Sequence, residues 1–524
     1  MRTNPVVFFT SAAFIVLFVA IAAIFPGPVS GIFGAMATWI SDSLGWLYIL
    51  LVTVFVGLVL VVGFSRYGNL RLGPDGSRPE YTNWAWFAML FTAGIGSVLM
   101  FYGVAEPISN FSSNPMNLET DTARAEAALN FPLYHYGLHA WGVFSLAGLT
   151  LAYFAHRKGM PMRMRSAFYP VFGERVNGPL GHVIDIFTVL GTAFGVAVTL
   201  GLAGSQVNAG LTRVAGLGES NLLQAAIVLS ITAVAAVSVG IGLDKGIRRL
   251  GQLNMILAII LMAFIVVVGP TVFIFQGTVQ AAGYYLQNLI EFSFWNQAYN
   301  DDGWQSSWTV FIWAWQISWA PFVGMFVARI SYGRTIREFV LGVLLAPLAF
   351  TIMWFGVFGN TALDIEINGP GGLAAIVDET LQAALFAMLE TFPLAVASSI
   401  LSLVVIIIFF ATSADSTSLV LDTLTSGDEE DSRPQQRIFW ALSLGAIALV
   451  LLFAGGLTAL SNVVTVTGLP FLIILAFMGY SLITALRTEA TQPRAEREPA
   501  QRPEEPVAVD GDSRARQGEV TKSR

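Results

Sequence analysis

Charge and cysteine are both scarce in this sequence. Its 524 residues include no cysteine, and only 12% are charged, with 27 Lys and Arg against 34 Asp and Glu. Without cysteine the chain has no disulfide, no thiolate nucleophile and no Cys-ligated metal. A soluble globular domain carries about 25% charged residues, so this chain has too little charge to cover a water-soluble protein of its length. The composition therefore indicates a membrane protein.

The few histidines and the mild net charge exclude further classes of protein. His135, His139, His156 and His182 form neither an HExxH motif nor a repeated metal-ligand spacing, so we expect no cofactor and no transition metal. The net charge of −7 and the pI of about 5.2 do not fit a nucleic-acid partner. Because cysteine and a GxSxG motif are both absent, an intramembrane enzyme has little support.

Long apolar runs, by contrast, are abundant. Hydrophobic residues make up 55% of the chain, and its mean hydropathy is +0.68. A helix needs about 20 mostly apolar residues to cross the hydrocarbon of a bilayer. A window of that length predicts an all-α membrane protein with twelve transmembrane helices. Their approximate cores are 5–26, 46–64, 84–104, 134–156, 183–212, 222–242, 253–276, 308–328, 339–363, 393–424, 438–456 and 462–486.

The basic residues predict the orientation of these spans. Cytoplasmic loops carry an excess of Lys and Arg. If the chain starts inside, 17 of the 27 basic residues precede the first span or lie in inner loops, whereas only Arg124 and Arg213 lie in outer loops. The sequence therefore predicts a multi-pass protein of the cell (plasma) membrane, surrounded by lipid, with both termini in the cytoplasm.

Three segments lie outside the predicted spans. Residues 280–295 mix aromatic and polar side chains, which is typical of an amphipathic helix in the membrane interface; a re-entrant loop is the alternative. Residues 371–390 have a helical pattern and no basic residue. The tail, 487–524, contains 8 basic and 8 acidic residues and several prolines, a composition that predicts a disordered cytoplasmic tail.

Two predicted spans contain residues that are unusual in a helix that only faces lipid: glycines in the third span and hydroxyl groups in the tenth. Gly94 and Gly96 would let the third span unwind and act as a hinge, freeing backbone carbonyls for a cation; close helix packing is the alternative. The tenth span carries Thr412, Ser413 and Asp415, and hydroxyl oxygens are suitable ligands for Na⁺. The alternative for these hydroxyls is hydrogen bonding to their own helix.

The eighth span is rich in tryptophan. Four tryptophans fall within the twelve residues from Trp308 to Trp319, and they run toward the middle of the span and not along its end. Trp315 and Trp319 are four residues apart, so they lie on one helix face. Several indoles on one face would form a box for a cation without hydrogen-bond donors, such as a quaternary ammonium. Aromatic packing is the alternative.

Five sequence runs closely resemble the betaine/carnitine/choline transporter (BCCT) family. In chain order they are GIGSVLMFYGVAEP, HYGLHAW with LAYFAHRKGMP, GTAFGVAVTLGL with QVNAGL, WAWQISWAPFVGMFVARISYGRTIREFVLGVLLAP and FFATSADSTSLVLDTLTSG. The resemblance implies a LeuT-like fold of inverted five-helix repeats behind two extra helices, assembled as a homotrimer. It divides the chain into leading helices and a cytoplasmic loop (1–82), a transporter core (83–486, with repeats at about 84–276 and 308–486) and the tail (487–524).

The resemblance also implies a set of substrate-binding residues. They are Tyr136, Trp141, Phe144, Trp315, Gln316 and Trp319. The sequence departs from the family pattern at Tyr136 and Gln316, where the family usually has Trp, and the glycine run GIGSV lacks the third glycine of betaine-type members. An amide at Gln316 weakens a purely aromatic cage but can hydrogen-bond a carboxylate, an amide or a ring nitrogen.

The resemblance further implies two sites for Na⁺ as the coupling ion. The first comprises the Thr412 and Ser413 side chains with the backbone of Thr92, Ile95 and Phe409, and the second comprises Thr192 and Phe322. Sodium symport is favoured over exchange because the fifth span has no Lys or Arg before Arg213. Proton coupling stays open, since Glu106, Asp185 and Asp415 lie in or near spans.

The function expected from these features is secondary active transport. We expect a Na⁺-coupled symporter that imports glycine betaine or a related quaternary ammonium solute by alternating access. The alternatives are an H⁺-coupled symporter or an exchanger of choline or carnitine, and a diverged carrier of ectoine, proline or sulfonium solutes. A sensor acting through its tail is less well supported, because the balanced tail charges form no polybasic patch.

Overall fold

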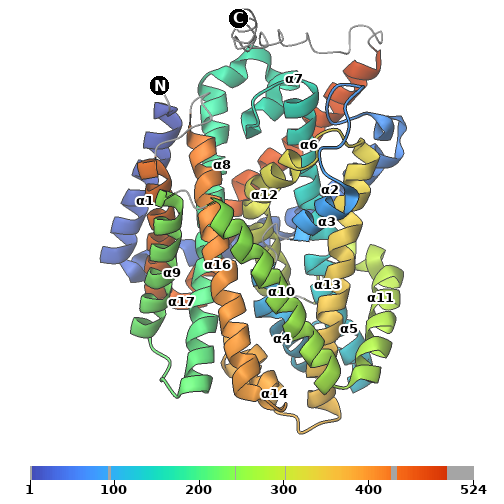
Figure 1. The fold of residues 1–524 in the computed structure, drawn as a ribbon, viewed down its shortest axis with the longest axis vertical. Helices are drawn as coiled ribbons and strands as arrows, with labels where there is room; N and C mark the ends of the chain where they lie inside the picture. The colour runs from blue at the N-terminus through green and yellow to red at the C-terminus, as the bar shows by residue number, and fades with distance from the viewer. Residues whose placement is uncertain (1–2, 92–95, 242–243, 301, 427–433, 492–524) are drawn as a thin grey trace, which may run out of the picture.

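The computed structural model describes residues 3–91, 96–241, 244–300, 302–426 and 434–491. Within these ranges the secondary structure is helical, apart from two isolated β-bridges. The helices run mostly along the long axis of one bundle (Figure 1).

Ten helical segments of the described chain are long and apolar enough to cross a membrane. They are α1 (Pro5–Ile24), α2 (Pro26–Phe64), α5 (Asp121–Tyr136) with α6 (Leu138–Ala152) and η2 (Tyr153–Arg157), α8 (Pro179–Ala215), α9 (Asn221–Ile241), α10 (Asp244–Val268), η5 (Ser306–Val310) with α12 (Phe311–Arg329), α13 (Ile336–Ile367), α16 (Ala395–Thr425) and α17 (Pro434–Thr491). Large apolar side chains such as Leu222 and Val267 remain 80% and 78% exposed, as expected for surfaces that lipid covers. The chain is therefore a multi-pass membrane protein.

One predicted span is interrupted in the structure, and another is described on either side of residues 92–95. The latter is the third span, whose described residues form α3 (Asn83–Phe91) and α4 (Gly96–Ser112). The fourth is longer than predicted: α5 begins at Asp121, where the Thr120 side chain caps the helix by accepting a hydrogen bond from the Ala123 amide. It then breaks at Gly137, whose φ of −90° and ψ of −129° are not helical.

The last helix is also interrupted. α17 has 58 residues, and a continuous helix of that length would measure about 87 Å, nearly three times the thickness of the hydrocarbon core. Gly455 and Gly456 have φ/ψ values of 164°/18° and 61°/−136°, which break the helix between the predicted cores 438–456 and 462–486. The helix continues to Thr491, so residues 487–491 are helical and do not belong to a disordered tail. The other residues of the predicted tail, 492–524, lie outside the described residues.

The boundary predicted for the seventh span is wrong. α10 ends at Val268, before Gly269 and Pro270, and residues 271–276 already belong to the next helix, α11 (Thr271–Phe294). Proline favours the start of a helix because it has no amide hydrogen to donate to the turn before it. The predicted interface segment 280–295 lies almost wholly in α11, so it is a helix and not a re-entrant loop.

α11 has one face buried against the bundle and one face exposed. Tyr285 and Phe292 are buried against the bundle, whereas Val279 and Ile290 are 75% and 71% exposed. The second predicted helical segment, 371–390, forms three short pieces. These are α14 (Leu373–Glu379), η6 (Leu381–Ala383) and α15 (Ala384–Glu390).

The centre of the bundle consists of α12 and the helices around it (Figure 1). In an 18-residue apolar stretch of each span, 94% of the residues are buried in the α12 span and 28% in the α10 span, so α12 faces protein and α10 largely faces lipid. Glycines let the neighbours approach closely: a Cβ at Gly324 would lie 2.8 Å from the Ala147 Cβ of α6, and a Cβ at Gly468 of α17 would lie 2.8 Å from the Ala314 carbonyl oxygen. The tryptophan-rich span is thus a core helix.

The two ends of the described chain are anchored at one end of the bundle, opposite α14 (Figure 1). The Thr3 hydroxyl donates to Gln436 Oε1 (3.0 Å), and the Asn4 amide donates to the Thr425 carbonyl (2.9 Å). The short elements η1, η3, α7 and η4 connect the longer helices there. Their bounds are Arg66–Asn69, Met164–Phe168, Tyr169–Phe172 and Gly173–Asn177.

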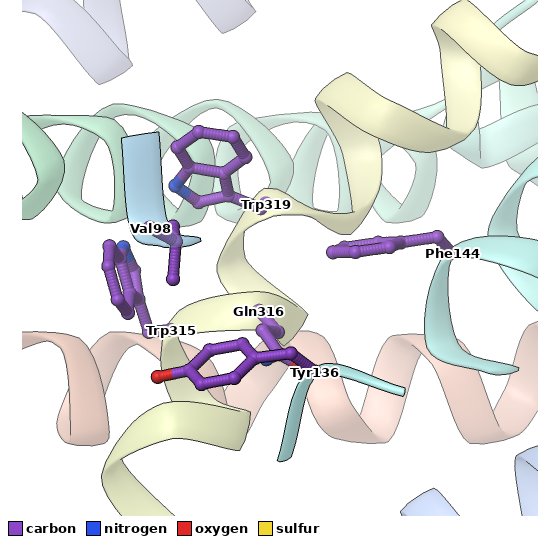
Figure 2. A pocket seen from close by; sticks show the side chains of 6 residues that line it. All are labelled: Val98, Tyr136, Phe144, Trp315, Gln316 and Trp319. Carbon is purple, nitrogen blue, oxygen red and sulfur yellow. The ribbon is translucent and has the colours of Figure 1, made fainter. Parts of the chain in front are cut away.

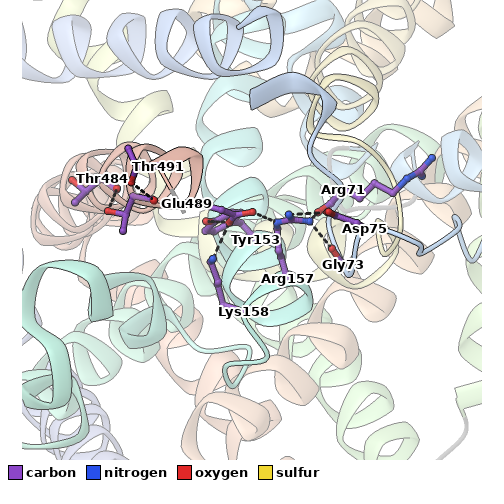
Figure 3. A network of polar contacts seen from close by, with 10 residues as sticks. Arg71, Gly73, Asp75, Tyr153, Arg157, Lys158, Thr484, Glu489 and Thr491 are labelled. Carbon is purple, nitrogen blue, oxygen red and sulfur yellow. Dashed lines mark hydrogen bonds and ion pairs between the residues drawn. The ribbon is translucent and has the colours of Figure 1, made fainter. Parts of the chain in front are cut away.

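A buried ionic network holds the end of α17 (Figure 3). Glu489 is 1% exposed; its carboxylate accepts from Arg157 Nε (2.5 Å) and the Tyr153 hydroxyl (2.5 Å), and it pairs with Lys158 Nζ (2.8 Å). Arg157 also pairs with Asp75 (2.9 Å), in the loop after η1. The network therefore ties the last helix to the end of the fourth span and to the loop that precedes α3.

Candidate substrate-binding site

A narrow cavity lies in the core of the bundle, where α4, α5, α6 and α12 meet. Its free volume is about 20 Å³, room for about one water molecule, so the side chains nearly close it. It is lined by Val98, Tyr136, Phe144, Trp315, Gln316 and Trp319. In Figure 2 the two indoles and the Tyr136 ring surround Val98, and Phe144 approaches from the other side. Five of the six predicted substrate residues therefore share one cavity.

Trp315 is held rigidly. Its indole Nε1 donates to the Gly195 carbonyl (3.0 Å) and to Thr199 Oγ1 (3.1 Å), both on α8. One face of the indole stacks on Phe311, with centroids 5.8 Å apart and an interplanar angle of 11°. The ring is thus fixed on both its edge and one face before any ligand arrives.

Trp319 lies one turn further along α12 and is less constrained. Its indole Nε1 is buried without a hydrogen-bond partner, and its ring makes an edge-to-face contact with Phe322 at 5.8 Å. A Cβ at Gly195 would lie 3.2 Å from Trp319 Cδ1 and 2.8 Å from the Ser318 Cβ. The glycine therefore lets α8 approach α12 at the cavity, and the free indole N–H is a donor available to a ligand.

Tyr136 comes from the last turn of α5, directly before the break at Gly137. Its ring stacks on Phe355 of α13, with centroids 5.6 Å apart and planes 10° apart. Its hydroxyl is buried and interacts with the Glu106 carboxylate, and its carbonyl accepts from Thr351 Oγ1 (3.3 Å). α13 thus supports both the ring and the backbone of this residue.

Gln316 has one amide atom engaged and one free. Nε2 donates to the His135 carbonyl (2.9 Å), whereas Oε1 is buried without a partner. The residue is only 8% exposed, and an unpaired buried acceptor costs about 1–3 kcal/mol. Gln316 therefore stabilises the α5–α6 break through Nε2 and leaves Oε1 without a donor.

Trp141 is the predicted substrate residue that does not line the cavity. It is 2% exposed and makes an edge-to-face contact with Phe144, with centroids 5.5 Å apart. It therefore touches a residue of the cavity wall without lining the cavity itself. Val98 is a lining residue that the sequence analysis missed, although it belongs to the run GIGSV, where only the glycines attracted attention.

The predicted first sodium site is described in part. Thr92, Gly94 and Ile95 lie outside the described residues. Gly96 at the start of α4, the other predicted hinge residue, lies so close to Phe409 of α16 that a Cβ at Gly96 would overlap the ring. Phe409, a residue of the predicted ion site, is therefore in contact with the start of α4.

The hydroxyls of this site are compatible with a cation. Thr412 Oγ1 donates within its own helix to the carbonyls of Ile408 (2.8 Å) and Phe409 (3.0 Å), as the alternative interpretation expected. A hydroxyl that donates its proton keeps its lone pairs, so Thr412 can still bind a cation. Ser413 beside it is 7% exposed.

The predicted second sodium site contains an unpaired oxygen. Thr192 on α8 is fully buried, and its Oγ1 has no hydrogen-bond partner. Phe322 on α12 is 6% exposed. An orphaned hydroxyl oxygen is a suitable ligand for a hard cation such as Na⁺. Among the described residues there is no group of three or more His, Asp or Glu side chains that could hold another metal ion.

Comparison with known proteins agrees with the resemblance drawn from the motifs. The model of the BCCT family, described as "betaine/carnitine/choline family transporter", matches residues 6–491. A glycine betaine transporter of Acinetobacter baylyi is 42% identical over 94% of this chain and 74% of its own length. An ectoine/glycine betaine/proline transporter of Corynebacterium glutamicum is 39% identical over 94% of this chain and 82% of its own length. A high-affinity choline transport protein of Escherichia coli K12 is 38% identical over 96% of this chain and 75% of its own length.

The names of these relatives agree on the class of protein and differ in the substrate. The match covers nearly the whole chain, including the cavity and the helices that form it. The chain therefore belongs to the betaine/carnitine/choline transporter family and is a membrane transporter, not an enzyme.

Proposed function

We propose that this transporter imports a quaternary ammonium compatible solute, such as glycine betaine, together with Na⁺ by alternating access. The observation that carries the proposal is the buried cavity with Trp315, Trp319 and Tyr136 in its wall. A quaternary ammonium cannot donate hydrogen bonds, so aromatic faces are the groups that can bind it in a dry site. Each well-placed desolvated ring contributes about 2 kcal/mol.

One unpaired donor beside the cavity suits the other end of a zwitterion. The Trp319 Nε1–H is buried and has no hydrogen-bond partner. Once the substrate has moved the rings apart, its carboxylate would accept from this donor and relieve the cost of leaving it unpaired. The cavity is narrow, so we expect the rings to move apart when the substrate enters.

Sodium coupling is supported by the hydroxyl oxygens beside the cavity helices. Thr412 and Ser413 lie on α16, whose Phe409 touches the start of α4, and Thr192 on α8 has an unpaired oxygen. Binding of Na⁺ between α4 and α16 would fix the position of α4 and so complete the substrate site. One Na⁺ driven by 100 mV contributes about 2.3 kcal/mol, or roughly fiftyfold accumulation.

We also propose twelve spans in a LeuT-like arrangement, two leading helices followed by inverted five-helix repeats. Counting α3 with α4 as one span, and α17 as two, gives twelve from the observed helices. An even number of spans agrees with the two described chain ends lying at one end of the bundle. The excess of Lys and Arg in the loops there favours a cytoplasmic location in the plasma membrane. We expect a homotrimer, which native mass spectrometry in detergent would test.

The deciding experiment is uptake of radiolabelled glycine betaine into proteoliposomes with an inward Na⁺ gradient. K⁺ replaces Na⁺ in the control, and a pH gradient without Na⁺ tests proton coupling. Unlabelled choline, carnitine, ectoine and proline serve as competitors. Accumulation that requires Na⁺ supports the proposal; accumulation driven by the pH gradient alone would replace Na⁺ with H⁺. If betaine is neither accumulated nor displaced by folded protein, the proposed substrate is wrong.

A second substrate class is favoured by one observation, the free Oε1 of Gln316. Glycine betaine, choline and sulfonium solutes have no N–H group to donate to it, whereas proline and ectoine do. If such a solute is the substrate, proline or ectoine should displace label better than betaine. Gln316→Trp should then reduce the preference for proline or ectoine over betaine by about tenfold. This factor corresponds to the loss of one hydrogen bond at a buried acceptor.

A further inference from the structure

His135 lies next to the cavity and is bonded on three sides. Its side chain is fully buried, and Nδ1 lies 2.6 Å from Glu106 Oε1 on α4. Its Nε2 lies 2.9 Å from Thr309 Oγ1 on η5. Its backbone carbonyl accepts from Gln316 Nε2 at 2.9 Å. None of these contacts is with a neighbouring turn of its own helix, so His135 joins three separate segments.

The position of His135 explains the need for these contacts. The helix breaks two residues later at Gly137, and carbonyls in the last turn of a helix have no amide partner within it. Gln316 provides a donor for the carbonyl of His135, and Thr351 provides one for the carbonyl of Tyr136. Without such donors the buried carbonyls would be unpaired, at about 1–3 kcal/mol each.

Thr309 and Gln316 hold His135 from the same helix. They are seven residues apart, close to two helical turns, so they lie on one side of the η5–α12 segment. Thr309 binds the side chain of His135 and Gln316 binds its backbone. This double contact fixes the last turn of α5 on α12, and Tyr136 is the next residue in that turn.

Glu106 completes the chain from the third span. It is fully buried and is near enough to interact electrostatically with the hydroxyls of Tyr102 and Tyr136. A buried carboxylate without a partner is costly, so the contact with His135 Nδ1 compensates for its burial. α4 is thereby bonded to α5 beside the α5–α6 break.

We propose that Glu106, His135 and Thr309 are positioning residues for the substrate site. They clamp the break after Tyr136 between α4 and α12, and so hold the Tyr136 ring and the Gln316 amide in the wall of the cavity. This inference rests on the proposed function and deepens it, because it identifies residues outside the cavity that set affinity for the amine substrate. It also gives Gln316 a structural role where the family usually has tryptophan.

The chain offers a matched pair of variants for the test. Thr309→Val removes a hydroxyl that is bonded to the Nε2 of His135. Ser293→Ala removes a hydroxyl that lies 3.0 Å from the Nε2 of His139, an equally buried histidine four residues further along whose ring stacks on Trp313 at 5.7 Å. Neither His139 nor Ser293 lines the cavity. The two variants thus make the same chemical change on opposite sides of the break.

The measurement is KM and maximal rate of Na⁺-driven uptake in proteoliposomes, with glycine betaine or whichever competitor the wild-type protein accumulates best. We expect Thr309→Val to raise KM about tenfold, the effect of one buried hydrogen bond, with a maximal rate within about twofold of wild type. Thr309→Ser should restore the wild-type KM, and Ser293→Ala should leave it unchanged. Glu106→Gln, which keeps the size of the side chain and removes its charge, is a second variant and should also raise KM.

The possible outcomes separate the two proposals. A wild-type KM in both Thr309→Val and Glu106→Gln would overturn the positioning role. So would an equal rise in KM in Ser293→Ala, because the effect would then be one of general stability. If Thr309→Val does not fold, as judged by size-exclusion chromatography, Glu106→Gln decides alone. Failure of the wild-type protein to transport any of the amines would refute the proposed function and this inference with it.

Discussion

The strongest single test of the aromatic site is the removal of the Trp315 side chain. Trp315 lines the cavity, and its ring is fixed by Phe311 and by two hydrogen bonds to α8. Trp315→Ala removes the ring face together with those bonds. Loss of one desolvated cation–π contact of about 2 kcal/mol corresponds to a rise in KM of about thirtyfold.

The hydrogen bonds of Trp315 contribute less to this change. The Gly195 carbonyl also accepts from Thr199 Oγ1 (3.1 Å), so neither partner on α8 is left without a hydrogen bond when the indole is removed. Trp315→Phe keeps an aromatic ring and loses only the two N–H contacts. We therefore expect Trp315→Phe to raise KM by no more than about fivefold. This factor corresponds to the loss of one neutral hydrogen bond, about 1 kcal/mol.

Trp313→Ala is the matched control. It removes the same side chain from the same helix, and Trp313 is as fully buried, but it stacks on His139 and does not line the cavity. Both variants should lose a similar amount of stability, about 3–5 kcal/mol, which a thermal melt in detergent measures. Only Trp315→Ala should change the KM of substrate uptake strongly. A wild-type KM in Trp315→Ala, or an equal rise in Trp313→Ala, would refute the cation–π interpretation.

Three further predictions concern the ion site and the helix contacts. The double variant Thr412→Ala/Ser413→Ala should raise the Na⁺ concentration for half-maximal uptake by at least about tenfold, since two oxygen ligands are lost; an unaltered Na⁺ dependence would contradict the assignment. Gly96→Ala should nearly abolish uptake, because its Cβ overlaps the Phe409 ring, and Phe409→Leu in the same chain should restore part of it; full activity of the single variant would exclude a tight contact. Glu489→Gln should lower the melting temperature by several degrees, because Arg157, which is 2% exposed, loses the more deeply buried of its two carboxylate partners. Deletion from residue 488 should do the same, whereas deletion from residue 492 keeps Glu489 and should not.

The sequence by itself determined the class of protein and most of the spans. Length and apolarity of a run are local properties, and the bilayer selects for them directly, so α1, α8, α9 and α16 lie where the apolar runs predicted them. The family, too, could be identified from short motifs, because each motif is a contiguous stretch of chain. Errors were confined to helix ends, as at α10, where Gly269 and Pro270 end the helix inside an apolar run.

The substrate site was only partly predictable. The spacing of Trp315 and Trp319 placed them on one face, but nothing in the sequence could distinguish a face that borders a cavity from one that packs against protein. For that reason Trp141 was included although it lies behind Phe144, and Val98 was missed.

Tertiary structure decided how distant polar groups pair. The bond from Gln316 to the His135 carbonyl joins residues 181 positions apart, and the contacts of His135 with Glu106 and Thr309 bridge 29 and 174 positions. The apolar pattern that fixes each helix is set within about 20 residues, whereas a buried polar group must find its partner wherever the packed helices bring one. The sequence therefore determined which helices form, and only their packing determined which side chains face the cavity and what holds them there.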